Sequence, residues 1–555
     1  MRGKLAVVEA LRREGVRYVF GNPGTSEMPI LELVASTPDI RYVLALQEGV
    51  AMGMADGYSR AARRPAFVQL HRDTGLANAV SLLINSAHGG SPLVLSAVNT
   101  DQRKLLEGRV DLTQMVSQFT KASVEVPRAD LIPAAFRHAF RVAARPPAGP
   151  VFVSLPFDIL DDEVDDVDEV DDVGAADAPR EQTDASTAPD AAAIAAAASM
   201  LATSSSPALL VGDRVAESGA VGWTVRLAEV LGCAVHAAHL SEVNFPTGHP
   251  LFRGTLAAPG GAGSDPLRDV DVLLAVGTSV FGGFFYLPGN SIGAGTRLIH
   301  LDSSAPEIGK NERTHIGIPG DIAAGLRALH GAVAAAVPAG DPRRRPAHSG
   351  PPLAARNGDR HAAPAESTPM PPEDLMRELA RALPPEAVVV EDAGTANAAL
   401  HEAIEFNEPG RLHGVRGGAM GWGMGAALGV QLADPGRRVI CVVGDGTAAM
   451  TVQALWTAAR AQLPVVYVVC NNGSYRVLKV NAQTYRRMVP SAEPGAPADA
   501  LVDLAPPVDF AEIAVAFGVH GRHIDGARAI GPAVAEAVAR REPALLDVSI
   551  DGSVS

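Results

Sequence analysis

Two apolar runs of strand length, residues 439–444 and 465–471, enclose a segment long enough for one helix. Their β-branched residues favour two buried parallel strands joined by a crossover helix, and such strands end at the same edge of a sheet. Asp445 follows the first run, whereas Asn472 and Ser474 follow the second. We therefore expect these polar residues to lie close together in space.

Their chemistry indicates what such an edge would bind. A carboxylate (Asp445), an amide oxygen (Asn472) and a backbone carbonyl (Ser474) are ligands suited to Mg²⁺ or Ca²⁺ when a phosphate completes the shell. Gly444 and Gly446 would let the backbone approach that phosphate, and a helix expected to start near Thr447 would point its N–H groups at it. A lone Gly-Asp-Gly or Asn-Asn-Gly is usually a turn, but the pair at two neighbouring strand ends predicts a metal–diphosphate clamp.

Composition limits the class of protein. The chain has 555 residues, of which 47% are hydrophobic and 20% charged, which is typical of a globular α/β protein with about three or four domains. The net charge of −15 argues against nucleic acid or an anionic membrane as the main partner. No N-terminal signal pattern and no run of 18 apolar residues is present, so we expect a cytoplasmic location. The three cysteines lack the spacing of metal ligands.

Strand and helix patterns alternate in three sections, which predicts an α/β fold of three doubly wound domains with parallel sheets. The expected domains cover residues 1–172, 190–337 and 371–555. An acidic run over 158–172 is interpreted as a solvated linker at the end of the first domain. Residues 338–370, rich in Pro, Gly and Ala, are expected to form a second linker.

The first section carries a second polar residue at a predicted strand end. The segment Leu44 to Glu48 delivers a carboxylate to the start of a helix rich in Ala and Gly. Taken alone, Glu48 is interpreted as an acid that the helix dipole favours in a first turn.

Several segments together resemble one enzyme family. They are Gly21 to Gly24, Leu46 to Tyr58, Leu70-His71 with Gly75 and Asn78, Gly429 to Leu432, and Asn471 to Ser474. Over nearly the whole chain the sequence resembles thiamine diphosphate-dependent 2-oxo acid decarboxylases and carboligases, most of all the benzoylformate decarboxylase type.

The resemblance implies a pyrimidine-binding, a central and a diphosphate-binding domain. Glu48 would hydrogen-bond N1′ of the aminopyrimidine and favour the imino tautomer that forms the ylid. Gly418 would offer its carbonyl to the 4′-amino group, and Met420 would bend the cofactor. Asp445, Asn472 and Ser474 would hold Mg²⁺, with Ca²⁺ as a substitute. Further cofactor contacts are implied for Asn78, Gly394, Thr395, Gly444, Gly446, Thr447 and Tyr475.

The family builds each site from the first section of one subunit and the third of another. A homodimer is therefore the minimum assembly, and a homotetramer is expected. FAD is not expected in the second section, where Gly277-Thr278-Ser279 is only a turn at a strand end.

Other positions would set the substrate. His71 matches the family's active-site His, and Thr25 falls where a Ser holds the substrate carboxylate. Phe284 stands where the benzoylformate type has a second catalytic His, and Asn481 where it has a Phe facing the substrate. Gln114 is a further candidate, because carboligating relatives place a polar side chain near that point.

The expected function is non-oxidative decarboxylation of a 2-oxo acid to an aldehyde through an ylid and an enamine. The alternative is a carboligase that forms acyloins, as acetolactate synthase and benzaldehyde lyase do, because Phe284 cannot relay a proton to the enamine. A non-catalytic scaffold that has kept the fold is a third alternative, but it predicts decay of the cofactor residues, all of which are present.

Overall fold

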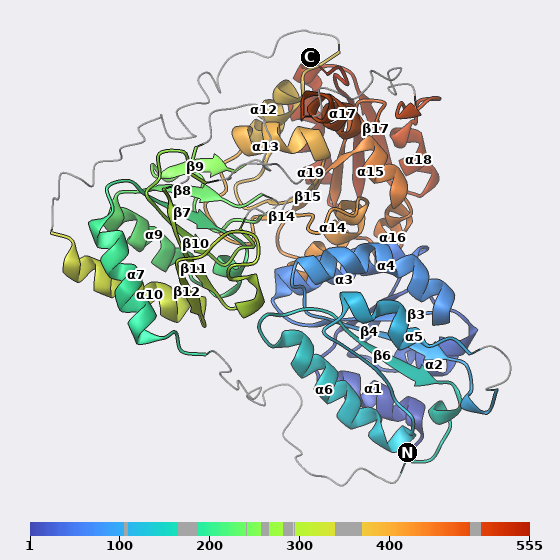
Figure 1. The fold of residues 1–555 in the computed structure, drawn as a ribbon. Helices are drawn as coiled ribbons and strands as arrows, with labels where there is room; N and C mark the ends of the chain where they lie inside the picture. Colours follow the sequence, from blue (N-terminus) through green and yellow to red (C-terminus); the bar gives the residue numbers. More distant parts are fainter. Residues whose placement is uncertain are drawn as a thin grey trace.

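A computed structural model describes residues 1–104, 109–164, 187–239, 241–256, 266–280, 292–293, 295–338, 369–488 and 501–554. The chain forms three six-stranded sheets whose paired strands all run parallel, each covered by helices, which confirms the three predicted doubly wound domains (Figure 1). No helix within these ranges has the length and apolarity needed to cross a bilayer.

The first sheet has the order β2-β1-β3-β4-β6-β5. Its strands are β1 (Tyr18–Gly21), β2 (Arg41–Leu44), β3 (Ala66–Leu70), β4 (Leu93–Asn99), β5 (Ala122–Glu125) and β6 (Val151–Pro156). Its helices are α1 (Gly3–Arg13), α2 (Met28–Ala35), α3 (Glu48–Ala62), α4 (Arg72–His88), α5 (Leu112–Val116) and α6 (Ile132–Ala144). A 3₁₀ turn, η1 (Thr25–Glu27), precedes α2, so the regular helix begins at Met28.

The start of the acidic run belongs to the first domain and not to a linker, which corrects that interpretation. Ile159 and Leu160 are buried in its core, and the Asp158 carboxylate accepts a hydrogen bond from the backbone N–H of Gln102. Asp161 pairs with Lys4 at 2.7 Å. Apolar side chains between the acids therefore hold this stretch down to residue 164, and the rest of the run, 165–172, lies outside the described residues.

The second sheet has the order β12-β11-β10-β7-β8-β9. Its strands are β7 (Pro207–Val211), β8 (Ala234–Ala237), β9 (Phe252–Thr255), β10 (Val272–Val276), β11 (Arg297–Asp302) and β12 (Ile316–Pro319). Its helices are α7 (Ala191–Thr203), α8 (Arg214–Glu217), α9 (Val221–Leu231) and α10 (Ile322–Ala336). Of the predicted linker 338–370, only residues 338, 369 and 370 are described.

The third sheet has the order β14-β13-β15-β16-β18-β17. Its strands are β13 (Val388–Asp392), β14 (Leu412–Gly414), β15 (Val439–Gly444), β16 (Val466–Asn471), β17 (His520–Ile524) and β18 (Ala544–Ser549). Its helices are α12 (Pro372–Ala382), α13 (Asn397–Ala403), α14 (Trp422–Ala433), α15 (Asp445–Met450), α16 (Ala454–Ala461), α17 (Arg476–Met488), α18 (Phe510–Ala516) and α19 (Ile530–Arg540). The β15–β16 pairing matches the predicted unit, although α15 begins at Asp445 and not near Thr447.

Helices α3 and α14 join the first and third domains (Figure 1). Glycines on both helices allow the backbones to touch: a Cβ on Gly57 would lie 2.3 Å from the carbonyl oxygen of Ala426, and one on Gly429 would lie 1.9 Å from that of Met54. A single apolar core continues through this contact from one sheet to the other. The helix that begins with Glu48 is therefore fixed to the domain that carries the predicted clamp.

Candidate cofactor site

The predicted clamp is assembled at the carboxyl ends of β15 and β16. The Asp445 carboxylate accepts hydrogen bonds from the backbone N–H groups of Gly446 (2.7 Å), Asn472 (3.0 Å) and Gly473 (2.7 Å). The side-chain oxygen of Asn472 in turn accepts from the N–H (3.0 Å) and hydroxyl (3.1 Å) of Ser474. These bonds bring the two strand ends together, as the sequence predicts.

The chemistry of this oxygen set fits a divalent cation. Asp445 is buried, and the hydrogen-bond donors that surround it are uncharged backbone amides. Burial raises the pKa of its carboxyl group, although the backbone amides oppose that effect. A bound cation would supply the positive charge that the described surroundings of this carboxylate lack, because buried charges are normally paired or metal-bound.

Glycine conformations leave room beside the clamp for a phosphate or a ring. Gly394, Gly418 and Gly473 have φ values of +55°, +82° and +68°, and no atom lies within 4 Å of the position that a Cβ would take at any of them. At Gly446 a Cβ would lie 2.3 Å from the ring of Tyr475, so that ring rests directly on the turn. Gly444, Thr395 and the buried Thr447 complete this edge of the sheet.

Asp392, which the sequence analysis missed, fixes the loop that carries Gly418 and Met420. This buried carboxylate at the end of β13 accepts a hydrogen bond from the backbone N–H of Gly423 at 2.9 Å, at the start of α14. Burial raises its pKa to about 7 against the opposing effect of backbone amides. A strand that ends in Asp shortly before a Gly-rich turn was the available signal.

Glu48 is held in the first domain by two amide side chains. Asn22 donates to one of its carboxylate oxygens and Asn78 to the other, both at 3.1 Å. The side chain lies 6% exposed at the start of α3, where Gln47 caps the helix by accepting from the N–H of Val50. Its carboxylate is thus fixed in place at the carboxyl edge of the sheet.

His71 lies on the same edge, beside the loop that carries Thr25. Its Nδ1 lies 2.8 Å from a carboxylate oxygen of Glu27 and 3.0 Å from the hydroxyl of Ser26. Thr25 is exposed, next to these residues. The structure therefore brings His71 and the Thr25 loop together and adds Glu27 and Ser26, which the sequence analysis did not single out.

The other expected substrate residues are not gathered in the same way. Gln114 is exposed on α5, where its backbone N–H bonds to Asp111 and its carbonyl accepts from Ser117. Asn481 is exposed on α17. Phe284 lies outside the described residues.

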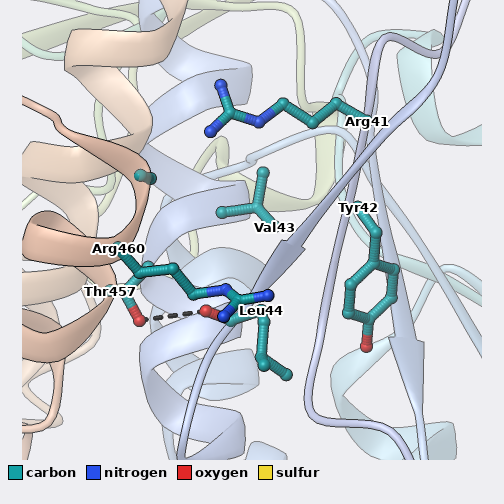
Figure 2. Close-up of a pocket in the computed structure, with 7 residues that line it drawn as sticks. Arg41, Tyr42, Val43, Leu44, Thr457 and Arg460 are labelled. Atoms are coloured by element: carbon teal, nitrogen blue, oxygen red, sulfur yellow. Dashed lines mark hydrogen bonds between the residues drawn. The ribbon is translucent and has the colours of Figure 1, made fainter. Parts of the chain in front are cut away.

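Within one chain, hydrogen bonds join the first and third domains both near Glu48 and at the loop that carries Gly418 and Met420. The hydroxyl of Thr457 on α16 donates to the carbonyl of Leu44 at 3.0 Å, where β2 ends before Glu48; Figure 2 shows this bond beside a cavity of about 320 Å³. On the other side, Asn85 of α4 exchanges hydrogen bonds of 2.6 and 2.9 Å with the backbone of Ala419. Asn85 is seven residues beyond Asn78, the partner of Glu48, which is about 10 Å along a helix.

Comparisons with known proteins agree with this geometry. The chain matches the thiamine pyrophosphate enzyme N-terminal TPP binding domain over residues 1–120, the central domain over 194–329 and the C-terminal TPP binding domain over 392–548. A benzoylformate decarboxylase of Pseudomonas aeruginosa is 33% identical over 98% of both chains. A probable acetolactate synthase large subunit of Methanocaldococcus jannaschii is 27% identical over 99% of this chain and 92% of the relative.

Among solved structures, a thiamine diphosphate-dependent 4-hydroxybenzoylformate decarboxylase of Rhodococcus jostii has a TM-score of 0.86 and 30% identity, and the match covers all of both chains. Each domain match falls on one of the three sheets, and the C-terminal match includes the ends of β15 and β16, where Asp445 and Asn472 lie together. The chain belongs to the thiamine pyrophosphate enzymes and resembles their benzoylformate decarboxylases throughout its length.

Proposed function

We propose that this protein decarboxylates a 2-oxo acid of the benzoylformate type to an aldehyde, with thiamine diphosphate and Mg²⁺ as cofactors. The observation that carries the proposal is the pairing of two half-sites on one scaffold. One is a buried carboxylate, Glu48, fixed by Asn22 and Asn78. The other is an oxygen clamp, Asp445 with Asn472, fixed by backbone amides.

The resemblance to thiamine pyrophosphate enzymes supports the following roles for the clamp residues. Asp445, the Asn472 side chain and the Ser474 carbonyl would hold Mg²⁺, and Ca²⁺ would substitute because it accepts the same oxygen ligands. Thr447 at the start of α15 would donate its N–H to the diphosphate, and Gly446, whose own N–H bonds to Asp445, would let the backbone approach it. Gly394, Thr395, Gly444 and Tyr475 would line it.

Glu48 would accept or donate a proton at the pyrimidine N1′, and the carbonyl of Gly418 would receive the 4′-amino group. Met420 would set the angle between the two rings, and Asn78 would hold Glu48 in place. When bound, thiamine diphosphate supplies a nucleophilic carbon and an electron sink for the pair of electrons that CO₂ leaves behind. The chain contributes position, charge and proton transfer.

On the substrate side, the Thr25 hydroxyl would donate to the carboxylate of the 2-oxo acid. His71 would deliver a proton to the substrate carbon that has lost CO₂. The methyl group of Thr25 would narrow the pocket relative to a Ser.

We also propose that each active site forms between two subunits. Within one chain, Ala419 contacts α4 about two turns beyond Asn78, which itself bonds to Glu48. The Gly418 loop and Glu48 therefore meet α4 at different places. A second copy, related by a twofold axis, would bring the Gly418 loop of one chain to Glu48 of the other. The assembly would be a homodimer or a homotetramer.

A carboligase is the second candidate function. Full-length similarity to an acetolactate synthase subunit supports it, as does Phe284 at the position of the second catalytic His. Without that proton relay, an added aldehyde would have longer to capture the adduct. Product analysis with and without an acceptor aldehyde separates the two functions: free aldehyde supports decarboxylation, and acyloin supports ligation.

The test of the main proposal is CO₂ release from a panel of aromatic, branched and dicarboxylic 2-oxo acids. The protein is stripped with a chelator and then given thiamine diphosphate with Mg²⁺, Ca²⁺ or no metal. We expect metal-dependent CO₂ release from at least one aromatic 2-oxo acid. Release from none of the panel, with the cofactor demonstrably bound, would refute the proposal.

A further inference from the structure

Glu27 is a fully buried carboxylate whose partners all lie in the Thr25 loop or on His71. One of its oxygens accepts from the hydroxyl of Ser26 at 2.8 Å. The other accepts from the N–H of Gly24 at 3.1 Å and lies 2.8 Å from Nδ1 of His71. No side chain in the described parts of the chain pairs with Glu27 except Ser26 and His71.

We propose that Glu27 is the positioning residue of the active site: it fixes the ring of His71 and holds its proton on Nδ1, so that Nε2 is the atom that exchanges protons with the reacting group. This inference rests on the proposed function for its chemical consequence, but the tautomer it assigns does not depend on turnover.

The hydrogen-bond geometry selects the tautomer. An unprotonated Nδ1 would point its lone pair at a carboxylate oxygen 2.8 Å away, which is repulsive, whereas Nδ1–H can donate to that oxygen. The Ser26 hydroxyl also lies 3.0 Å from Nδ1 and already gives its own hydrogen to Glu27, so it too can only accept from the ring. Both neighbours therefore require a hydrogen on Nδ1.

The other ring nitrogen remains free for chemistry. Among the described residues, the bonds of the His71 ring are all made by Nδ1, and a third of the side chain is exposed while Glu27 is fully buried. Gly75 lies between His71 and Glu48, since a Cβ there would lie 3.2 Å from a Glu48 oxygen and 3.5 Å from Cβ of His71. Nε2 is thus the ring nitrogen that makes no hydrogen bond to the described residues.

Backbone conformation indicates that the ring is held for a purpose other than capping its own helix. His71 occupies the N-cap position of α4 but makes no side-chain cap bond. The next residue, Arg72, has φ of +40°, a strained value for a side chain with a Cβ. Within the described ranges, the three other non-glycine residues with positive φ, Arg63, Gln462 and Arg541, all end helices, where that conformation is ordinary.

Gly24 leaves the space that the imidazole ring of His71 occupies. A Cβ at this position would lie 2.0 Å from Nδ1 of His71, so only glycine allows the imidazole to reach Glu27. The same N–H of Gly24 that bonds to Glu27 starts the turn that presents Thr25. One buried carboxylate therefore positions both the proton carrier and the loop expected to hold the substrate carboxylate.

The first test reads the tautomer directly. The holoenzyme, with thiamine diphosphate and Mg²⁺ bound, is labelled with ¹⁵N-histidine, and His71 is assigned among the 15 histidines by its loss in His71→Gln. In the neutral ring we expect a protonated Nδ1 and an unprotonated Nε2. In Glu27→Gln we expect loss of that single form, with the other assigned histidines unchanged. The opposite tautomer in the wild-type protein, or no change in the variant, would overturn the assignment.

The second test separates positioning from a structural role of the loop. Glu27→Gln should lower kcat by about 10- to 100-fold, the range for loss of a partner that orients an active-site group and less than loss of the proton-transfer group itself, and should leave the Kd of thiamine diphosphate unchanged. In a His71→Ala background the same substitution should cost less than about twofold, because the two residues act as one unit. Full additive losses in the double variant would refute the proposal.

Two further variants serve as controls. Ser26→Ala removes the second acceptor but keeps the carboxylate, so its loss in kcat should be much smaller than that of Glu27→Gln. Gly24→Ala keeps every partner but displaces the ring, so it should reproduce the altered His71 spectrum. If no 2-oxo acid is turned over and the Nδ1–H tautomer is nonetheless observed, the proposed function fails while this assignment stands.

Discussion

Nδ1 of His413 on β14 lies 3.0 Å from a carboxylate oxygen of Glu242 in the central domain. The same carboxylate pairs with Arg60, on the helix that begins with Glu48, and lies 3.6 Å from the guanidinium of Arg416. These residues line a cavity of about 1050 Å³ between the three sheets. The Glu242 carboxylate therefore links the central domain to α3, which begins with Glu48, and to the segment of β14 and Arg416, which precedes Gly418.

Replacing Glu242 by Gln should destabilise the protein by about 3 kcal/mol, because Arg60 and Arg416 would lose a charged partner in a largely buried place. Burial alone would raise the pKa of Glu242, but Arg60, His413 and Arg416 outweigh it and hold the pKa well below its ordinary range. The carboxylate thus stabilises the fold above its unfolded pKa of about 4.5 and loses this effect as the pH falls.

Thermal unfolding at pH 7 and at pH 4 measures this effect. The difference in Tm between wild type and Glu242→Gln should be large at pH 7 and smaller at pH 4. Glu229→Gln is the matched control, since Glu229 lies in the same domain with a side chain that is 56% exposed and 3.5 Å from His249. Equal Tm losses in the two variants would argue that the contacts of Glu242 with the other two domains do not stabilise the protein.

Asp392 makes stability fall as the pH rises. Its folded pKa is raised to about 7 from 3.8, because burial penalises the charged form more than the amides at the start of α14 favour it. The unfolded chain therefore releases this proton between about pH 4 and pH 7 while the folded protein keeps it, and the free energy of unfolding should decline by up to about 4 kcal/mol over that interval.

Asp392→Asn should remove this decline, since Asn keeps an oxygen for the N–H of Gly423 and carries no charge. The measurement is Tm of the cofactor-free protein from pH 5 to pH 8, in wild type and variant. We expect the variant to gain stability relative to wild type toward pH 8. A constant difference across the range would show that Asp392 does not titrate there.

The clamp could be predicted from the sequence because its parts are local. The strands β15 and β16 are apolar and adjacent in the sheet, so their ends had to bring Asp445 and Asn472 together. The start of α15 could not be placed as well. Gly444 stays extended and the helix begins at Asp445, whose carboxylate is turned toward the amides that follow β16.

Residues that act through distant partners were not predictable in this way. Glu27 is one acid in an ordinary turn until the fold brings His71, 44 positions away, against it. Glu242 has its charged partners only because the fold brings Arg60 and His413 from the other two domains against it. The acidic stretch near residue 160 is a related case. Its charges indicate a solvated linker, but the apolar Ile159 and Leu160 within it are buried in the core of the first domain.

Metal dependence should follow from the state of Asp445. We expect Asp445→Asn to raise the Kd of thiamine diphosphate at least about 100-fold in the presence of Mg²⁺, because the variant loses the negative charge that would pair with the cation. Isothermal titration with and without Mg²⁺ measures this. Asp525→Asn is a suitable control, because that carboxylate lies in the same domain, is 75% exposed and lies 2.8 Å from His523. Metal-independent cofactor binding by wild type would contradict the clamp.

The arrangement of sites across two subunits predicts complementation between inactive variants. Glu48→Gln should lose turnover by about 100-fold or more through the lost proton relay, and Asp445→Ala should lose it through the cofactor. If each site takes Glu48 from one chain and Asp445 from another, a mixed dimer has one site with both defects and one intact site. If sites lie within a chain, every site in the mixed dimer carries one defect.

Random reassociation of equal amounts of the two variants gives half mixed dimers, with half of their sites intact, so activity should recover to about a quarter of wild type. The mixture is dissociated, recombined with thiamine diphosphate and Mg²⁺, and assayed for CO₂ release beside each variant treated alone. Wild type carried through the same treatment sets the full scale. Activity no higher than that of the separate variants, with mixed dimers shown to be present, would place Glu48 and Asp445 of one chain at the same cofactor.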